Sequence, residues 1–196
     1  MESVLDRVIK QNTENVNLLK TKDYNIFSVL QIQSKEVLIC RMIADLLNPR
    51  GQHGAGAEYL KIFLRDCLGM EKMDTKLADQ AIVTAEYAID DERRIDIVIE
   101  IGSYFLPIEV KIYAADQKSQ CFDYYQYAKR RDAQAKVYYL TLDGHRPGKD
   151  STSSGSQSVT EEDIVCLSFR EHILNWLKAC KNCGNTGMIP ILEQFI

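Results

Sequence analysis

The chain has 196 residues, of which 45% are hydrophobic and 27% are charged, and its net charge is −4 at pH 7. This size and composition are ordinary for a globular chain with a substantial core. No apolar run approaches the roughly 20 residues of a membrane span, and the start of the chain lacks the apolar region of a signal peptide, so a cytoplasmic location is expected. The acidic balance excludes a surface coated in Lys and Arg for general nucleic-acid binding, but it leaves room for a local basic groove.

Helices are predicted in the first third of the chain. Apolar side chains recur at helical spacing in three segments, residues 2–20, 34–49 and 57–70. Ser34 is the expected N-cap of the second helix, and Asn48 followed by proline is its stop signal. The glycine-rich stretch "RGQHGAG" is a loop between the second and third helices. It contains His53, for which a catalytic role and a loop-stabilising role are both open.

Extended segments dominate the middle of the chain. Strands are predicted at residues 81–89, 94–101, 104–113, 136–142 and 163–169. The first three have short connections, which favour an antiparallel meander. A helix over residues 115–132 separates the third strand from the fourth. The order of elements predicts an α/β fold with a mixed central sheet of about five strands flanked by helices.

The last part of the chain combines a long loop with helices. Residues 143–160 are rich in Gly, Ser and Thr and read as a structureless loop, which in a compact fold is usually functional or mobile. A helix is predicted over residues 170–180. The final stretch, "MIPILEQFI", reads as the first turns of a helix without a C-cap, so we expect the natural protein to continue beyond it. We expect one domain over 1–196, with a helical part at about 1–75 and an α/β core at about 80–180.

One hairpin places two acidic side chains opposite each other. If Gly102 and Ser103 form the turn, Asp96 faces Glu109, with Cβ atoms roughly 4.5–5.5 Å apart, and Lys111 shares their face of the sheet. Like charges in that position repel unless a cation lies between them. Two carboxylates and a backbone carbonyl suit Mg²⁺ with several waters, and a lysine can help to activate one of those waters. An ordinary solvated face, with Asp96 paired to a neighbouring base, is the alternative.

The same two strands carry a family signature. "RRIDIVIE" followed by "PIEVKIY" resembles the motif of the PD-(D/E)XK nuclease superfamily, with Asp96, Glu109, Val110 and Lys111 in the motif positions. Ile95 stands where the Pro of the family name would be. The resemblance extends over about residues 25–142 and implies a restriction-endonuclease-like core.

Flanking motifs add to this resemblance. "QCFDY", from Gln120 to Tyr124, is similar to the Gln-x-x-x-Tyr motif of one large branch, and the four-residue spacing puts both side chains on one helical face. The stretch from residue 34 to 56 is similar to the N-terminal helix and His-Gly loop of an uncharacterised bacterial branch. In that branch a Glu of the helix, here Glu36, is expected near the metal. Asp45 on the same helix could take its place, and Glu86 is a further acidic candidate.

The resemblance implies a metal-dependent nuclease. Asp96, Glu109 and the carbonyl of Val110 would hold Mg²⁺ or Mn²⁺, and Lys111 would position the attacking water. Gln120 and Tyr124 would hydrogen-bond near the metal or the phosphate. Four bases in the following helical segment are candidates for contacts with the nucleic-acid backbone: Lys118, Lys129, Arg130 and Arg131. The expected substrate is DNA rather than RNA, in defence or repair, and a homodimer is a possible assembly.

Two other functions are compatible with parts of the pattern. A catalytically inactive nuclease fold could bind nucleic acid or a partner protein, and the acidic net charge favours this reading. The intact set of Asp96, Glu109 and Lys111 favours the active enzyme. A glycosidase with two carboxylates would leave Lys111 without a role and lacks an obvious aromatic platform for a sugar.

Overall fold

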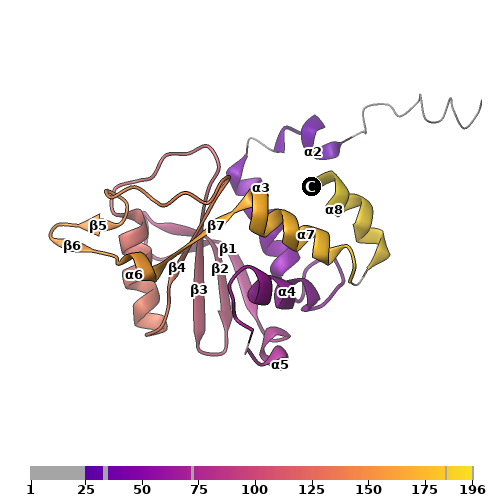
Figure 1. The fold of residues 1–196 in the computed structure, drawn as a ribbon, viewed down its shortest axis with the longest axis horizontal. Helices are drawn as coiled ribbons and strands as arrows, with labels where there is room; N and C mark the ends of the chain where they lie inside the picture. Colours follow the sequence, from indigo (N-terminus) through magenta and orange to yellow (C-terminus); the bar gives the residue numbers. More distant parts are fainter. Residues whose placement is uncertain (1–24, 33–34, 72, 184, 196) are drawn as a thin grey trace, which may run out of the picture.

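A computed structural model of the chain describes residues 25–32, 35–71, 73–183 and 185–195 (Figure 1). The helix predicted over residues 2–20 and the expected N-cap Ser34 lie outside the described residues. None of the helices in the described ranges is long and apolar enough to cross a lipid bilayer.

The described elements follow the predicted order. The α-helices are α2 (Ile26–Val29), α3 (Glu36–Leu47), α4 (Glu58–Asp66), α5 (Thr75–Ala78), α6 (Gln120–Arg131), α7 (Leu174–Cys180) and α8 (Ile189–Phe195). The strands are β1 (Ile82–Ala88), β2 (Arg94–Ile101), β3 (Tyr104–Lys111), β4 (Val137–Thr141), β5 (Ser153–Ser154), β6 (Gln157–Ser158) and β7 (Ile164–Ser168). Short helical turns are η2 (Glu161–Asp163), η3 (Phe169–Ile173) and η4 (Thr186–Met188).

The central sheet has the strand order β1-β2-β3-β4-β7. Strands β1, β2 and β3 pair antiparallel, whereas β3, β4 and β7 pair parallel. Parallel neighbours need a crossover connection, and α6 provides it between β3 and β4. This mixed sheet with helices on its faces confirms the predicted restriction-endonuclease-like architecture.

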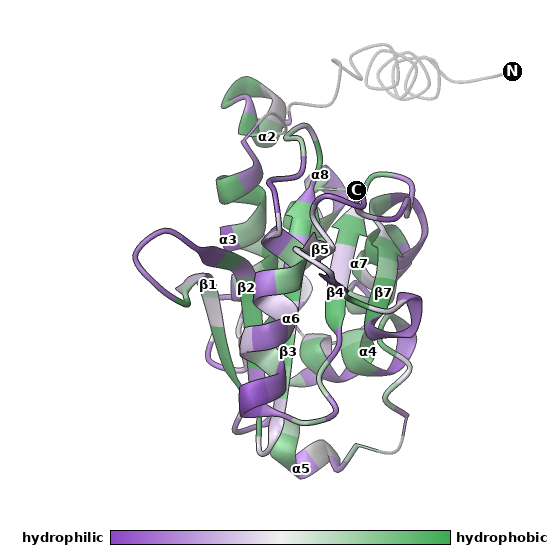
Figure 2. Ribbon diagram, turned by 90° about the vertical axis from the view of Figure 1, so that its left-hand side faces the viewer, coloured by the Kyte–Doolittle hydropathy of each residue, from purple (hydrophilic) through white to green (hydrophobic). Residues whose placement is uncertain are grey.

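Helices cover the two faces of the sheet unequally. Helix α6 lies on one face, and α3, α4 and α7 lie on the other (Figure 1). The largest group of buried apolar side chains joins α3, α4 and α7 to the sheet. Two smaller groups lie under α6. In Figure 2 the strands of the sheet are largely hydrophobic, while α6 in front of them is largely hydrophilic, so α6 presents one face to the core and a polar face to solvent.

The register of the β2–β3 hairpin agrees with the prediction. Ile101 pairs with Tyr104, and the ladder continues to Ile97 opposite Ile108. Gly102 takes a φ of 57° in the turn, a conformation that glycine adopts without strain. One step beyond the last ladder pair, this register places Asp96 opposite Glu109.

The strand alternation decides which side chains meet which layer. Ile108 and Val110 of β3 belong to the large core with α3, α4 and α7. Glu109 and Lys111 therefore point to the face that α6 covers. Both are buried, and charged side chains are rarely buried in a protein unless they are paired.

Three parts of the chain differ from the sequence-based prediction. The helix predicted from residue 115 starts only at Gln120, because Ser119 adopts a left-handed conformation with φ 57°. The loop over residues 143–160 is not structureless, since it contains the small antiparallel hairpin β5–β6. The helix predicted over residues 170–180 is present but begins with the π-helical turn η3.

Candidate active site

Asp96 lies where the pairing of β2 with β3 ends. Its Oδ2 accepts a hydrogen bond from the backbone N–H of Val110 at 2.8 Å, so the carboxylate is fixed beside β3 rather than turned to solvent. The Val110 side chain is buried in the core on the opposite face, which leaves only its backbone on the side of the acids. The two predicted carboxylates are thus neighbours on one face of the sheet.

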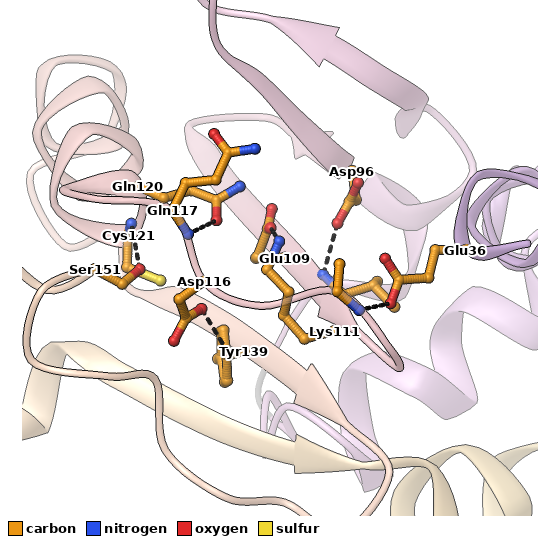
Figure 3. Close-up of polar contacts among 12 residues, drawn as sticks. Glu36, Asp96, Glu109, Lys111, Asp116, Gln117, Gln120, Cys121, Tyr139 and Ser151 are labelled. Atoms are coloured by element: carbon orange, nitrogen blue, oxygen red, sulfur yellow. Dashed lines mark hydrogen bonds and ion pairs between the residues drawn. The ribbon is translucent and has the colours of Figure 1, made fainter.

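Glu109 and Lys111 form a closed ion pair next to Asp96 (Figure 3). The Nζ atom of Lys111 lies 2.5 Å from Oε1 of Glu109, and the side chain of Glu109 is only 1% exposed. The second oxygen, Oε2, is buried and has no hydrogen-bond partner among the described residues. When both acids are ionised, neither can donate to the other, and a proton or a cation between them would satisfy this atom.

Burial and mutual repulsion change the protonation of the three groups. Burial, followed by the charge of Asp96, raises the pKa of Glu109 well above its usual value. Burial also raises the pKa of Asp96, although the Val110 N–H and the Lys111 ammonium oppose this. Burial alone would lower the pKa of Lys111, but the charges of Glu109 and Asp96 outweigh it and raise the pKa. These shifts favour a proton shared by the two carboxyl groups and the charged form of the lysine.

Glu36 lies at the point where the chain leaves β3. Its Oε1 accepts three backbone N–H groups, from Ile112 at 2.7 Å, Tyr113 at 2.6 Å and Ala114 at 3.0 Å. Burial disfavours the charge of Glu36, but these hydrogen bonds together lower the pKa of its carboxyl below the usual value. The charge of Glu36 contributes to raising the pKa of Asp96 and of Lys111. Glu36, the acid of α3 that was predicted near the metal, therefore borders the site.

Gln120 and Tyr124 line the site from α6. Both are buried, and Gln120 Nε2 donates to the hydroxyl of Tyr124 at 3.1 Å. The Tyr124 hydroxyl in turn donates to the backbone carbonyl of Arg94 on β2. Burial, followed by the charge of Glu109, raises the pKa of Tyr124. The motif thus holds α6 against the strand that carries Asp96.

The four basic residues that were predicted to contact the nucleic-acid backbone do not form one basic surface. Lys129 is paired with Asp163, at 3.6 Å, and Arg131 with Glu100, at 2.7 Å. These two cations are therefore partly neutralised within the fold. Arg130 lies over the ring of Tyr127, at 5.4 Å from its centroid, and Lys118 is exposed just before α6. Of the four, Lys118 lies nearest in sequence to the Gln120 side of the site.

The remaining acidic candidates are occupied elsewhere. Asp45 Oδ1 accepts the backbone N–H of Gln52 at 3.1 Å, in the loop after α3. Glu86 forms an ion pair with Arg41 at 2.6 Å and has a φ of 54°, in β1. Glu36, rather than Asp45, is therefore the acid of α3 that borders the site.

His53 stabilises its loop. It is 1% exposed and stacks on Tyr59 with ring centroids 4.7 Å apart. Nδ1 accepts the backbone N–H of Ala55 at 3.1 Å, so the other nitrogen, 2.9 Å from the carbonyl of Asn48, is the donor. Both ring nitrogens are used within the loop, and the structural alternative is the one that the contacts support.

Two residues near the site were not singled out in the sequence. The guanidinium of Arg93 joins the turn before β2 to the start of α6, through Asp123 at 3.1 Å and Gln117 at 2.8 Å. Asp116 accepts a hydrogen bond from Tyr139 of β4 at 2.8 Å. Neither fills a motif position, although Arg93 begins the quoted stretch "RRIDIVIE". Both contacts join segments distant in sequence, so no local pattern signals them.

The donor set fits a divalent cation that keeps water ligands. Within the described residues, no group of three or more His, Cys, Asp or Glu side chains could hold a metal ion. The site offers two adjacent carboxylates, Asp96 and Glu109, and one of their oxygens is buried without a partner. Mg²⁺ is commonly bound by one or two carboxylates and completes its shell with water and substrate phosphate, which matches this set.

The comparison with known families agrees with the site. A sequence model of the PD-(D/E)XK nuclease superfamily matches residues 24–191. The chain belongs to this superfamily, which confirms the resemblance predicted from the strand motifs. No curated protein and no solved structure matches the chain at a significant level.

Proposed function

We propose that this protein is a divalent-metal-dependent nuclease that hydrolyses phosphodiester bonds, with DNA as its substrate, in defence or repair. The observation that carries the proposal is the buried, unpartnered oxygen of Glu109 beside the Asp96 carboxylate. Burial of two neighbouring carboxyl groups opposes folding, so a structural role alone does not account for them. The cationic neighbour Lys111 and the membership of the family support the same reading.

Each residue has a role in this proposal. Asp96, Glu109 and the carbonyl of Val110 would hold Mg²⁺ or Mn²⁺, which when bound neutralises charge that develops on the phosphate. Lys111 keeps its proton and would orient the attacking water by hydrogen bonding. Gln120 and Tyr124 would fix α6 against β2 so that the site keeps its shape. Glu36 would hold the chain that leaves β3.

Calorimetric titration of Mn²⁺ tests the metal site. We expect the wild type to bind Mn²⁺ and Asp96→Ala to lose the binding heat. Glu100→Gln is the matched control, because Glu100 lies on the same strand but is paired with Arg131. Both variants and the wild type are then incubated with plasmid and with single-stranded DNA. We expect metal-dependent cleavage by the wild type and by Glu100→Gln only.

The same experiment separates the active enzyme from the alternative. Nucleic-acid binding without metal binding or cleavage would identify a nuclease fold that binds but does not cut. If Asp96→Ala retained full activity, the proposed site would be wrong. Cleavage of both strands of a duplex would call for two sites, and sedimentation of the active species would then test for the homodimer.

A further inference from the structure

The loop between β4 and β7 is attached to the first turn of α6. The backbone N–H of Ser119 donates to the carbonyl of Asp150 at 2.7 Å, and the N–H of Phe122 donates to the carbonyl of Ser151 at 3.0 Å. Ser151 is fully buried. Residues 148–153 thus satisfy backbone groups at the start of α6 that would otherwise lack partners.

Asp116 ties the same loop to the sheet. One carboxylate oxygen accepts the hydroxyl of Tyr139 at 2.8 Å, and the other accepts the backbone N–H of Gly148 at 2.7 Å. Tyr139 pairs in register with Glu109 on the neighbouring strand. In Figure 3, Asp116 and Tyr139 lie on one side of Glu109, opposite Glu36 and Asp96. The loop is therefore held beside the proposed site from two directions.

This attachment brings two lysines to adjoining segments. Lys118 precedes Ser119, Lys149 precedes Asp150, and Ser119 and Asp150 are joined by their backbone hydrogen bond. Both lysines are exposed, and neither forms an ion pair within the described ranges. The two other basic side chains of the loop, by contrast, have acidic partners: His145 contacts Asp143, and Arg146 contacts Glu161.

We propose that Lys118 and Lys149 form a phosphate-binding pair at the rim of the active site, with Lys149 as the contact that the loop supplies. Two exposed lysines on segments joined by a backbone hydrogen bond raise the local positive potential, which favours binding of a phosphate. Lys118 is two residues before Gln120, which lines the site, and Lys149 follows Gly148, which is bonded to Asp116 beside Glu109. Both lysines therefore lie on segments that border the proposed site. The inference rests on the proposed function, because the anion is taken to be the backbone of the substrate.

Asp116 is the positioning residue of this pair. It contacts Gly148, next to Lys149, and fixes the loop relative to β4. The neighbouring Asp150 carboxylate weakens the local positive potential, so the expected contribution of Lys149 is that of a single phosphate contact. Contacts of this kind position a nucleic acid without reading its sequence.

The test is the salt dependence of DNA binding by the full chain. Lys149→Ala is compared with Lys178→Ala, an exposed lysine of α7 on the other side of the sheet. Both are made in the Lys111→Ala background, so that DNA is not cut while Mg²⁺ is present. Binding of a short labelled duplex is followed by fluorescence anisotropy over a range of salt concentrations. We expect Lys149→Ala to weaken binding roughly 3–10-fold at low salt and to reduce the slope of log K against log salt by about 0.9. Lys178→Ala should change neither.

A double-mutant cycle tests Asp116. If it positions Lys149, Lys149→Ala should have little further effect on affinity in an Asp116→Ala background, whereas a purely structural role would leave the two effects additive. Thermal unfolding of both variants shows that they are folded.

The outcomes separate the inference from the proposed function. If the wild type binds and cuts DNA, but Lys149→Ala and Lys178→Ala have the same affinity and the same salt slope, the phosphate-binding pair is wrong and the proposed function stands. Wild type that neither binds nor cuts any nucleic acid would overturn the proposed function and the pair with it. Additive effects in the cycle would remove the role of Asp116.

Discussion

The carboxyl groups of Asp96 and Glu109 lie side by side on the face of the sheet that α6 covers, and the one buried cation beside them, Lys111, is paired with Glu109. Two acids and one ammonium leave an excess negative charge in a buried place. The raised pKa of both acids favours uptake of a proton in the metal-free protein. The same excess makes the place suitable for a divalent cation.

The first prediction concerns stability and pH in metal-free buffer. A raised pKa in the folded state stabilises the protein fully below the unfolded value near 4, and this contribution is lost as pH rises through the folded pKa. We therefore expect wild-type stability to fall with rising pH above about 4 through this pair. At neutral pH, Asp96→Asn should raise the free energy of unfolding by on the order of 1 kcal/mol and therefore unfold at a higher temperature. In acid the difference from the wild type should vanish. Thermal melts across pH measure this. A lower melting temperature for the variant at neutral pH would mean that the Val110 contact outweighs the repulsion.

The second prediction concerns the lysine. Lys111→Ala should abolish cleavage while the fold persists, because Glu109 can take up a proton when its ammonium partner is gone. Lys136→Ala, an exposed lysine before β4, is the control and should cut normally. Plasmid cleavage and circular dichroism measure the two effects. Unchanged cleavage by Lys111→Ala would contradict the proposed mechanism.

The third prediction concerns the hydrogen bonds between the Glu36 carboxylate and the backbone that follows β3. Glu36→Ala removes the acceptor of three backbone N–H groups, so the amides of Ile112, Tyr113 and Ala114 should exchange with solvent faster. Glu36→Gln keeps an acceptor oxygen and should protect them better. The pKa of Glu36 is lowered, so its ionised form contributes stability above the unfolded value, and this is lost as pH falls through the folded pKa. Amide exchange measured by NMR would refute the contact if the three amides were unaffected by Glu36→Ala.

The fourth prediction separates structural from catalytic histidine. His53→Ala should lower stability by about 2 kcal/mol, because two hydrogen bonds and a ring contact are lost in a buried place. The loop packs closely on the ring, since a Cβ at Gly51 would lie 2.6 Å from it, so loss of the ring leaves a space. Binding of Mn²⁺ should be unchanged below the melting temperature. Loss of metal binding by a folded His53→Ala protein would show that His53 has a role in the metal site.

The fifth prediction concerns the helix motif. Tyr124→Phe removes the hydroxyl that joins Gln120 to the Arg94 carbonyl. We expect a loss of about 1 kcal/mol in stability and slower cleavage with little change in Mn²⁺ affinity, because the acids stay in place. Tyr125→Phe, which removes a hydroxyl bonded to Asp163 on another side of α6, is the matched control. Equal cleavage rates for the two variants would assign Tyr124 to the core alone.

The hairpin could be predicted because its determinants are local. The two turn residues set the register, and the alternation of Ile108, Glu109 and Val110 sets the faces. The opposition of Asp96 and Glu109 follows from these two facts and needs no knowledge of the remaining fold. The strands and their mixed order were likewise accessible from apolar patterns and connection lengths.

Other parts of the site depend on contacts between distant segments. The pairing of Arg131 with Glu100 and of Lys129 with Asp163 joins α6 to β2 and to the region before β7, so four bases that are close in sequence do not act alike. The hairpin β5–β6 has few apolar residues. Asp150 and Ser151, just before it, are joined to the start of α6 by backbone hydrogen bonds, which leave no periodic signal. Asp116 is a single acid between two elements, and only the folded chain shows what it holds.

The unpartnered oxygen of Glu109 has a consequence for protein engineering. A library of variants selected only for heat resistance without metal would favour substitutions that neutralise Asp96 or Glu109, because these relieve buried repulsion. Selection in the presence of Mg²⁺ would favour the native acids, since ligand binding to the folded state raises its stability. The two selections would therefore give different residues at positions 96 and 109, depending on whether Mg²⁺ is in the medium.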